Sequence, residues 1–193
     1  MYWQFQEVSR LTREQLAQAY DRMAPSRRDH IQRFRREEDR DRSLAGEWLL
    51  RQLLQTHWNL SSPQILRQEN GRPILEDGAL FISIAHSDDL VVCAADERPV
   101  GIDVEKCKPF RWALAERICT PEEWEYLCRG VCPEGALCTE EAVISRFYEI
   151  WTGKEAWFKM LGTGLQDLRS VNVLPLKRQV FRQGDYLIQI VQM

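Results

Sequence analysis

Two acidic residues stand two positions apart in the segment Gly101-Ile102-Asp103-Val104-Glu105. Alternate residues of a β-strand share a face, so Asp103 and Glu105 would lie side by side while their apolar neighbours face the core. Two adjacent carboxylates repel each other unless a cation lies between them, and hard oxygen ligands suit Mg²⁺ or Mn²⁺ beside a substrate phosphate. The segment therefore indicates a divalent-metal site; the alternative is an ordinary amphipathic strand with a solvated outer face.

A second pattern lies between residues 151 and 159. Glu155 and Lys159 are four positions apart and Trp151 is one turn before Glu155, so all three share one face of a helix. The functional interpretation makes Glu155 a metal ligand or a base and Lys159 a clamp for a phosphate. The alternative is an exposed ion pair, which contributes only about 0.3–0.5 kcal/mol.

Histidine and arginine side chains elsewhere could bind a phosphate. His86 follows an apolar segment, and its imidazole could donate a hydrogen bond to a phosphate oxygen. A group of basic residues lies in a highly charged stretch, and guanidinium forks suit phosphate partners. The alternatives are a surface-loop histidine and a salt-bridged, solvated helix. The basic group is Arg27, Arg28, His30, Arg40 and Arg42, with Arg72 in a later turn.

Composition limits the class of protein. The 193 residues are 44% hydrophobic and 28% charged, which is typical of one compact unit or of two small halves that share a core. A net charge of −3 gives no support for nucleic-acid binding. The longest apolar run, 90–95, is far shorter than the ~20 residues that cross a bilayer, and no signal peptide is visible. Six cysteines without a Cys-x-x-Cys pair indicate reduced thiols, and we expect a cytoplasmic protein.

Strands and helices are expected in blocks, which predicts an α+β fold. Thr12 with Gln15 and Thr120 with Glu123 have the spacing of helix capping boxes. Three short apolar segments from residue 79 onward predict a meander of strands. The expected helices span 12–23, 44–58, 110–118, 120–128 and 139–161. The expected strands span 2–8, 79–84, 90–95, 100–104, 170–174, 179–181 and 186–191.

Taken in order, the motifs resemble those of the 4′-phosphopantetheinyl transferases, most closely the surfactin-synthetase-activating type. The paired signature is carried by Gly101-x-Asp103-x-Glu105 and, further along, by Trp151-x-x-Lys154-Glu155-Ala156-x-x-Lys159. Upstream motifs of the family are matched by Asp39-x-x-Arg42-Ser43-x-x-Gly46, Gly71-Arg72-Pro73 and Ile84-Ala85-His86-Ser87. Each motif is short, but their ordered conjunction is specific.

The resemblance implies two similar α/β halves related by a pseudo-twofold, with the second half shortened. We place the halves at 1–105 and 106–193, with the active site at their junction. It also implies transfer of the phosphopantetheine arm of coenzyme A to a serine of an apo acyl or peptidyl carrier protein, with release of 3′,5′-ADP. The family uses Mg²⁺, and Mn²⁺ also suits the ligands. We expect a monomer without nucleic-acid or membrane partners.

Residue roles follow from the same resemblance. Asp103, Glu105 and Glu155 would hold the metal ion, and Glu155 or a metal-bound water would take the serine proton. Lys159 would offset charge on the pyrophosphate, with Lys154 beside it. The phosphates at the nucleotide end would be bound by Arg27, His30, Arg42, Ser43, Arg72, Ala85 (through its backbone N–H) and His86.

Three features depart from the family pattern. Ala85 stands where the family usually has serine, which removes one hydroxyl contact. His30 stands where other members often carry lysine, which weakens the phosphate clamp at pH 7. The tail after Val173 is short compared with that of the larger members. Ala85 and the short tail support a first alternative, a non-catalytic module that binds coenzyme A or a carrier protein. The second is a plain interaction protein in which every charged motif is a solvated face.

Overall fold

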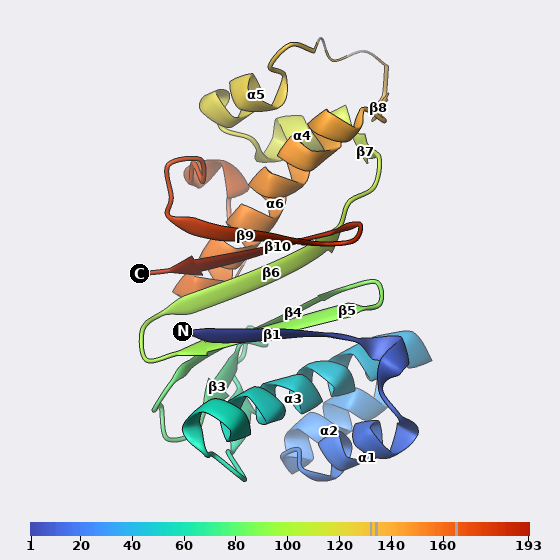
Figure 1. The fold of residues 1–193 in the computed structure, drawn as a ribbon, viewed down its shortest axis with the longest axis vertical. Coiled ribbons are helices and arrows are strands. Elements are labelled where there is room, and N and C mark those ends of the chain that lie inside the picture. The colour runs from blue at the N-terminus through green and yellow to red at the C-terminus, as the bar shows by residue number, and fades with distance from the viewer. Residues whose placement is uncertain (132, 134, 165) are drawn as a thin grey trace.

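The protein is built from two halves of similar design (Figure 1). The computed structural model describes residues 1–131, 133, 135–164 and 166–193. The first half contains β1 (Tyr2–Glu7), a 3-10 turn (Val8–Arg10), α1 (Arg13–Asp21), α2 (Pro25–Gln32), α3 (Glu37–Trp58), β2 (Ile65–Arg67), β3 (Pro73–Leu75), β4 (Phe81–Ser87) and β5 (Leu90–Asp96). The second contains β6 (Val100–Lys106), β7 (Phe110–Arg111), α4 (Trp112–Ile118), α5 (Pro121–Leu127), β8 (Leu137–Cys138), α6 (Glu141–Leu161), a 3-10 turn (Leu168–Ser170), β9 (Arg178–Gln183) and β10 (Tyr186–Gln192).

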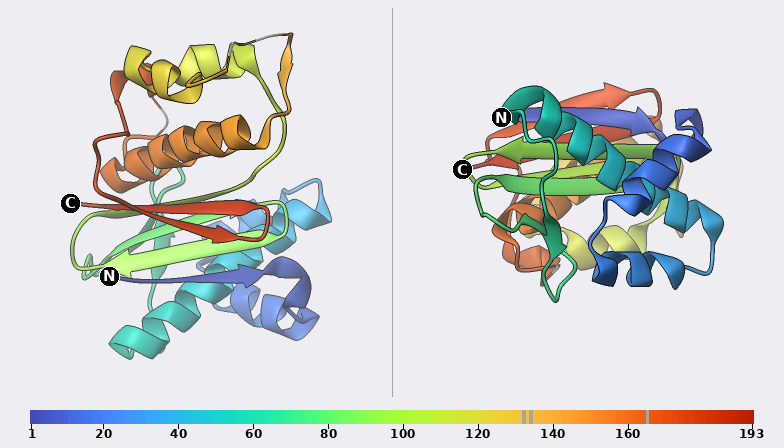
Figure 2. Two further views of the ribbon diagram at one scale, coloured as in Figure 1. Left: turned by 45° about the horizontal axis from the view of Figure 1, so that its top comes forward. Right: turned by 90° about the horizontal axis from the view of Figure 1, so that it is seen from below.

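The two main sheets repeat one strand pattern. The first has the order β1-β5-β4 and the second the order β6-β10-β9, and all neighbours are antiparallel. α3 packs on the first sheet and α6 on the second, and the two sheets lie between these helices (Figures 1 and 2). The predicted α+β fold of two similar halves is confirmed.

Serine side chains bridge the two sheets where β4 runs beside β6. The Ile102 backbone N–H donates to Ser83 Oγ at 3.1 Å, and the Lys106 N–H donates to Ser87 Oγ at 3.1 Å. A shared apolar core fills the space between the sheets, with Val92 from the first and Val104 and Ile188 from the second. The halves therefore cannot move apart without exposing their common core.

Local sequence signals explain where several helices begin and end. Both capping boxes are present: Thr12 and Gln15 exchange hydrogen bonds at the start of α1, and Thr120 and Glu123 do so at α5. α6 ends at Gly162, whose φ of 73° places it in the left-handed region that favours glycine.

Two expectations about the strands are wrong. β6 does not continue a meander, because it pairs with β10 of the second sheet rather than with β5. The predicted strand at 170–174 is the end of a 3-10 turn followed by a loop. The Leu168 and Val171 carbonyls accept hydrogen bonds from Lys154, and the Val173 N–H donates to Glu123. Side chains, not a neighbouring strand, therefore satisfy this backbone.

The short hairpin of β2 and β3 was not expected from the sequence. It surrounds the turn that the sequence did indicate, at 69–73, and pairs Ile65 with Leu75. Among the described residues, none of the helices combines the length and apolar composition that a membrane crossing requires.

Candidate active site

Close packing of α6 on β6 brings the two main motifs together. A Cβ atom at Gly101 would lie 1.9 Å from the Ala156 carbonyl oxygen and 2.6 Å from the Met160 nitrogen, so only glycine permits this approach. As a result, Lys159 Nζ lies 2.6 Å from Asp103 Oδ1. Residues from two distant motifs thus form one ion pair at the junction of the halves.

Two further carboxylates, those of Glu105 and Glu155, lie near this ion pair. Asp103 is only 3% exposed, and its Oδ2 atom has no hydrogen-bond partner within the described residues. Glu105 Oε2 accepts from Ser87 Oγ at 2.8 Å, and Glu105 Oε1 accepts from Trp151 Nε1 at 3.4 Å. Burial raises the pKa of Asp103 to about 7; Lys159 opposes this shift, whereas the charges of Glu155 and Glu105 add to it.

The charges of Glu155 and Lys159 depend on each other. Burial raises the pKa of Glu155, the charge of Lys159 opposes the shift, and Glu105 adds to it. Burial disfavours the ammonium of Lys159, but the neighbouring Asp103 and Glu155 raise its pKa overall. Lys159 is therefore a stable cation, and its side chain is still 32% exposed and can be reached by a ligand.

The chemistry of these donors fits a hard divalent cation. Asp103, Glu105 and Glu155 supply carboxylate oxygens that repel one another, and Asp103 Oδ2 is a buried acceptor without a donor. In the described part of the chain, no group of three or more His, Cys, Asp or Glu side chains is already arranged to hold a metal ion. Lys159 is bound to Asp103 instead, and Ser87 is bound to Glu105. A cation would thus have to draw the carboxylates together.

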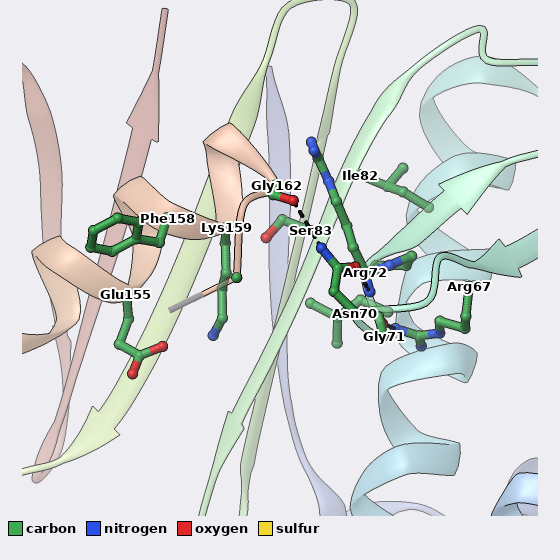
Figure 3. Close-up of a pocket in the computed structure, with 13 residues that line it drawn as sticks. Arg67, Asn70, Gly71, Arg72, Ile82, Ser83, Glu155, Phe158, Lys159 and Gly162 are labelled. Atoms are coloured by element: carbon green, nitrogen blue, oxygen red, sulfur yellow. Dashed lines mark hydrogen bonds between the residues drawn. The ribbon is translucent and has the colours of Figure 1, made fainter. Parts of the chain in front are cut away.

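A cavity of about 360 Å³ extends from these residues toward the β2–β3 turn (Figure 3). α6 forms one wall and the turn forms the opposite wall, with β4 between them. Cationic side chains occur on both walls, so the cavity suits a ligand with more than one anionic group. The lining residues are Arg67, Asn70, Gly71, Arg72, Pro73, Ile82, Ser83, Ile84, Glu155, Phe158, Lys159, Gly162 and Gly164.

The β2–β3 turn holds the end of α6. Arg72 Nη2 donates to the Met160 carbonyl at 3.3 Å, and Asn70 Nδ2 donates to the Gly162 carbonyl at 2.9 Å. A Cβ atom at Gly162 would lie 1.6 Å from Arg72 Nη1, so a larger residue there would displace the Arg72 guanidinium from this position. The turn therefore links the first half to the helix that carries Lys159.

The other predicted phosphate-binding residues fall into two groups. Arg27 donates to Ser43 Oγ, and His30 lies close enough to Arg27 for that charge to lower its pKa, although burial is the larger cause. Partial desolvation of the imidazole lowers the pKa of His86, and the charges of Lys159 and Arg42 also lower it. The structure thus brings His86 near Lys159, while Arg27 and Ser43 form a separate pair.

Lys154 does not lie beside Lys159, and this prediction is wrong. Its side chain is fully buried, its Nζ lies 2.7 Å from Glu123 Oε2, and it donates to the Leu168 carbonyl at 2.7 Å. Residues five apart on a helix point roughly 140° away from each other, so the two lysines of the motif face different surroundings.

Ala85 also falls outside the cavity lining. It is 5% exposed and packs in the core between the sheets, opposite Val92. A strand that alternates its side chains turns Ala85 inward and leaves its neighbour His86 exposed. A contact to ligand through the side chain of Ala85 is therefore excluded in this conformation.

Arg67 and Asn70 line the cavity but were not identified from the sequence. Arg67 ends a three-residue strand that is too short to show a periodic pattern. Asn70 lies inside a turn whose composition was evident, and its contact with Gly162 depends on packing between distant segments.

Two family models together match most of the chain. The model of the 4′-phosphopantetheinyl transferase superfamily matches residues 99–189, and the model of the N-terminal part of 4′-phosphopantetheinyl transferase matches residues 10–98. They meet in the connection between β5 and β6. Together with the sheet pairing, this favours a division before β6 rather than after it.

Individual relatives give the same result. The chain is 32% identical over 146 residues to 4′-phosphopantetheinyl transferase Sfp of Bacillus subtilis (strain 168), which covers 74% of this chain and 62% of that relative. It is 33% identical over 156 residues to 4′-phosphopantetheinyl transferase psf-1 of Bacillus pumilus, covering 79% and 64%. With 4′-phosphopantetheinyl transferase ffp of Bacillus subtilis it shares 30% identity over 159 residues, covering 80% and 67%.

The fold consists of two α+β halves, and an acidic site that contains a lysine lies at their junction. The family models match the sequence of both halves. The chain belongs to the 4′-phosphopantetheinyl transferase superfamily. It spans less than two thirds of the length of the first two relatives, 62% and 64%.

Proposed function

We propose that this protein transfers the 4′-phosphopantetheine arm of coenzyme A to a serine hydroxyl of an apo acyl or peptidyl carrier protein. The observation that carries the proposal is the cavity between the halves. Glu155 and Lys159 line one wall, with Asp103 paired to Lys159, and Arg67 and Arg72 line the opposite wall. This separation suits a molecule with a pyrophosphate and a further phosphate. The relatives named above are called transferases of this group.

The reaction balances with groups that the chain supplies. The serine oxygen forms a bond to the phosphorus that bears pantetheine, and the bond from that phosphorus to the bridging oxygen of the pyrophosphate breaks. The electron pair leaves with 3′,5′-ADP, and the serine proton passes to Glu155. Burial raises the pKa of Glu155, which suits a general base. Lys159 offsets the negative charge that grows on the leaving group.

Asp103, Glu105 and Glu155 would hold a Mg²⁺ or Mn²⁺ ion. When bound, such an ion polarises phosphoryl oxygens and favours an in-line approach. The unpartnered Asp103 Oδ2 atom supports this assignment, since a buried acceptor without a donor is costly to a folded protein. Lys159 binds the opposite oxygen, Oδ1, and so holds the Asp103 side chain in place.

The remaining basic residues would bind the nucleotide end of coenzyme A. Arg72 lines the cavity directly, and His86 lies near Lys159. Because guanidinium forks bind phosphate oxygens in pairs, Arg27 and Arg42 supply geometry as well as charge. His30 and Ser43 complete this group beside Arg27.

The charged segment that runs from the end of α2 into the first turn of α3 offers a surface for the carrier protein. Its exposed arginines are Arg33, Arg35, Arg36 and Arg40. Docking helices of carrier proteins are commonly acidic, and complementary charge accelerates association.

All groups of the proposed site come from one chain, so we propose that the protein acts as a monomer.

The decisive experiment is the intact mass of an apo carrier protein after incubation with this protein and coenzyme A. Parallel samples contain Mg²⁺ or a chelator. A gain of one phosphopantetheine with the metal only is expected. A gain in both samples would contradict the metal assignment. No gain across acyl and peptidyl carriers, with coenzyme A still bound in calorimetry, would support the non-catalytic module instead.

A further inference from the structure

Glu47, a buried carboxylate in α3, lies near Arg27 and Arg67, and Arg67 lines the cavity wall opposite Lys159. Glu47 is 1% exposed, and its Oε1 accepts from Arg51 Nε at 3.1 Å and Nη2 at 2.8 Å. Arg51 is also nearly buried and donates to the Arg22 and Pro63 carbonyls, each at 3.0 Å. Arg51 therefore has a complete set of partners and a structural role.

Arg67 and Arg27 lie beside the same carboxylate but are not satisfied by it. Arg67 Nη2 is 4.0 Å from Glu47 Oε2, which is too far for a hydrogen bond. The charge of Glu47 partly opposes the burial that lowers the pKa of Arg27, but the Arg27 guanidinium donates its hydrogen bond to Ser43 Oγ. Three guanidinium groups share one carboxylate, so positive charge remains in excess at this end of the cavity.

Both arginines also keep a buried donor without a partner. The Nε atoms of Arg27 and Arg67 are buried, and the described residues offer no acceptor to either. Arg67 Nη1 donates to the Gly71 carbonyl at 3.2 Å. The edge of the guanidinium formed by Nε and Nη2 is thus left over, and this edge is one that binds two oxygens of an anion together.

Mutual repulsion shows that these cations form one cluster. The pKa of Arg67 is lowered to about 10, mainly by burial and also by the charge of Arg27, while the charge of Glu47 opposes the shift. Burial lowers the pKa of His30, and Arg27, Arg33 and Arg67 add to this effect. An anion bound here would relieve both the repulsion and the unsatisfied donors.

The cluster opens into the cavity of the proposed active site. Arg67 lies on the wall opposite Glu155 and Lys159, next to the turn that carries Arg72 (Figure 3). An anionic group on Arg67 would therefore belong to the same ligand as a group that contacts Lys159.

We propose that Arg67, together with Arg27, binds the phosphate monoester at the nucleotide end of coenzyme A and makes the protein select coenzyme A over 3′-dephospho-coenzyme A. The inference rests on the proposed function. It assigns to Arg67 a recognition role that the sequence motifs did not indicate. A phosphate monoester presents several oxygens to a guanidinium fork, which a lysine could not match in geometry.

The competing explanation is that Arg67 only holds the β2–β3 turn through the Gly71 carbonyl. In that case its removal would weaken every ligand of the cavity equally. A comparison of two ligands that differ by the single phosphate separates the two explanations.

The test is calorimetric binding of coenzyme A and of 3′-dephospho-coenzyme A. The proteins are the wild type, Arg67→Gln, Arg67→Lys and the control Arg117→Gln, which changes an exposed arginine on α4. Arg67→Gln should weaken coenzyme A binding by about tenfold or more, as expected for a lost charge-assisted contact. Binding of the dephospho compound should stay within about twofold, because the contact is absent there. Arg67→Lys should fall between the wild type and Arg67→Gln, and Arg117→Gln should match the wild type.

Equal weakening of both ligands would overturn the inference and leave Arg67 as a turn residue. Equal affinity of the wild type for the two ligands would overturn it as well, as would a wild type that binds neither. Selective weakening without any transfer to carrier proteins would support the inference while contradicting the proposed reaction. If Arg67→Gln fails to fold by circular dichroism, Arg27→Gln undergoes the same comparison, with the same selective loss expected.

Discussion

Lys159 Nζ and Asp103 Oδ1 lie 2.6 Å apart and join helix α6 to strand β6. The pair is asymmetric, because Asp103 is almost fully buried while about a third of the Lys159 side chain is exposed, 32%. Three carboxyl groups, those of Asp103, Glu105 and Glu155, surround the single ammonium of Lys159, so acidic groups are in excess. That excess is what a divalent cation offsets, and the exposed ammonium remains available to a phosphate.

Replacing Asp103 by asparagine should abolish transfer and leave the fold intact. The amide keeps the shape of the side chain but removes a metal ligand and the charge that holds Lys159. We expect the rate to fall by at least about 10²-fold, the scale of losing one electrostatic contact in a preorganised site. The intact-mass assay measures the rate, and circular dichroism checks the fold.

Glu97→Gln is the matched control, since it changes an exposed carboxylate in the β5–β6 connection to an amide. It should leave the rate unchanged. Glu155→Gln should behave like Asp103→Asn. Full turnover in both site variants would contradict the assignment of this site.

Arg72→Gln should raise the Michaelis constant for coenzyme A more than it lowers kcat. Arg72 lies in the cavity wall, and a charge-assisted phosphate contact is worth on the order of 1.5–3 kcal/mol. Steady-state kinetics with varied coenzyme A provide the measurement.

Arg72 also holds the end of α6 through the Met160 carbonyl, so a second variant is needed. Asn70→Ala removes the neighbouring bond to the Gly162 carbonyl without changing charge. A rise in the Michaelis constant of equal size in Asn70→Ala would mean that anchoring of α6, and not the charge of Arg72, governs binding.

Lys154→Met should destabilise the protein strongly. The change leaves Glu123 buried without its cation, which costs about 3–5 kcal/mol when one partner of a buried pair is removed. Adding Glu123→Gln should recover part of the loss, since the amide oxygen can still accept from the Val173 or Thr120 N–H. Chemical denaturation of both variants gives the free energies of unfolding.

Local patterns predicted much of this fold. Alternation and short β-branched runs located β1, β4, β5 and β6, and the capping boxes at Thr12 and Thr120 located two helix starts. The sheet that receives β6 could not be predicted, because β10 lies at the other end of the chain and pairing is decided by tertiary packing. The loop at 170–174 was mistaken for a strand because Lys154 and Glu123, which satisfy it, are distant in sequence.

The site residues could also be predicted only where local spacing, and not tertiary packing, determines their position. The spacing of Glu155 and Lys159 fixes a common helix face, so both could be placed from the sequence. The surroundings of Lys154 could not be predicted, because its position in the motif does not indicate that Glu123 is buried against it. Arg67 carries no local signal, and only the cavity reveals it.

Magnesium should stabilise the protein more at pH 8 than at pH 6. Burial raises the pKa of Asp103 to about 7, above the value of about 3.9 for an exposed aspartate. A group with a raised pKa in the folded state contributes stability at low pH and loses it as the pH rises through the folded value. The metal-free protein should therefore lose stability between pH 6 and 8.

A metal ion binds the ionised form of Asp103. At pH 6 the metal ion must first displace the proton of this carboxyl group, whereas at pH 8 the proton has already dissociated. Thermal unfolding with Mg²⁺ and with chelator at both pH values measures the difference. Asp103→Asn cannot titrate, so both the loss of stability in the metal-free protein and the stronger effect of Mg²⁺ at pH 8 should be smaller than in the wild type; Glu155, whose pKa is also raised, accounts for what remains. An equal rise in Tm with Mg²⁺ at both pH values in the wild type would mean that Asp103 is not the ligand whose proton the metal displaces.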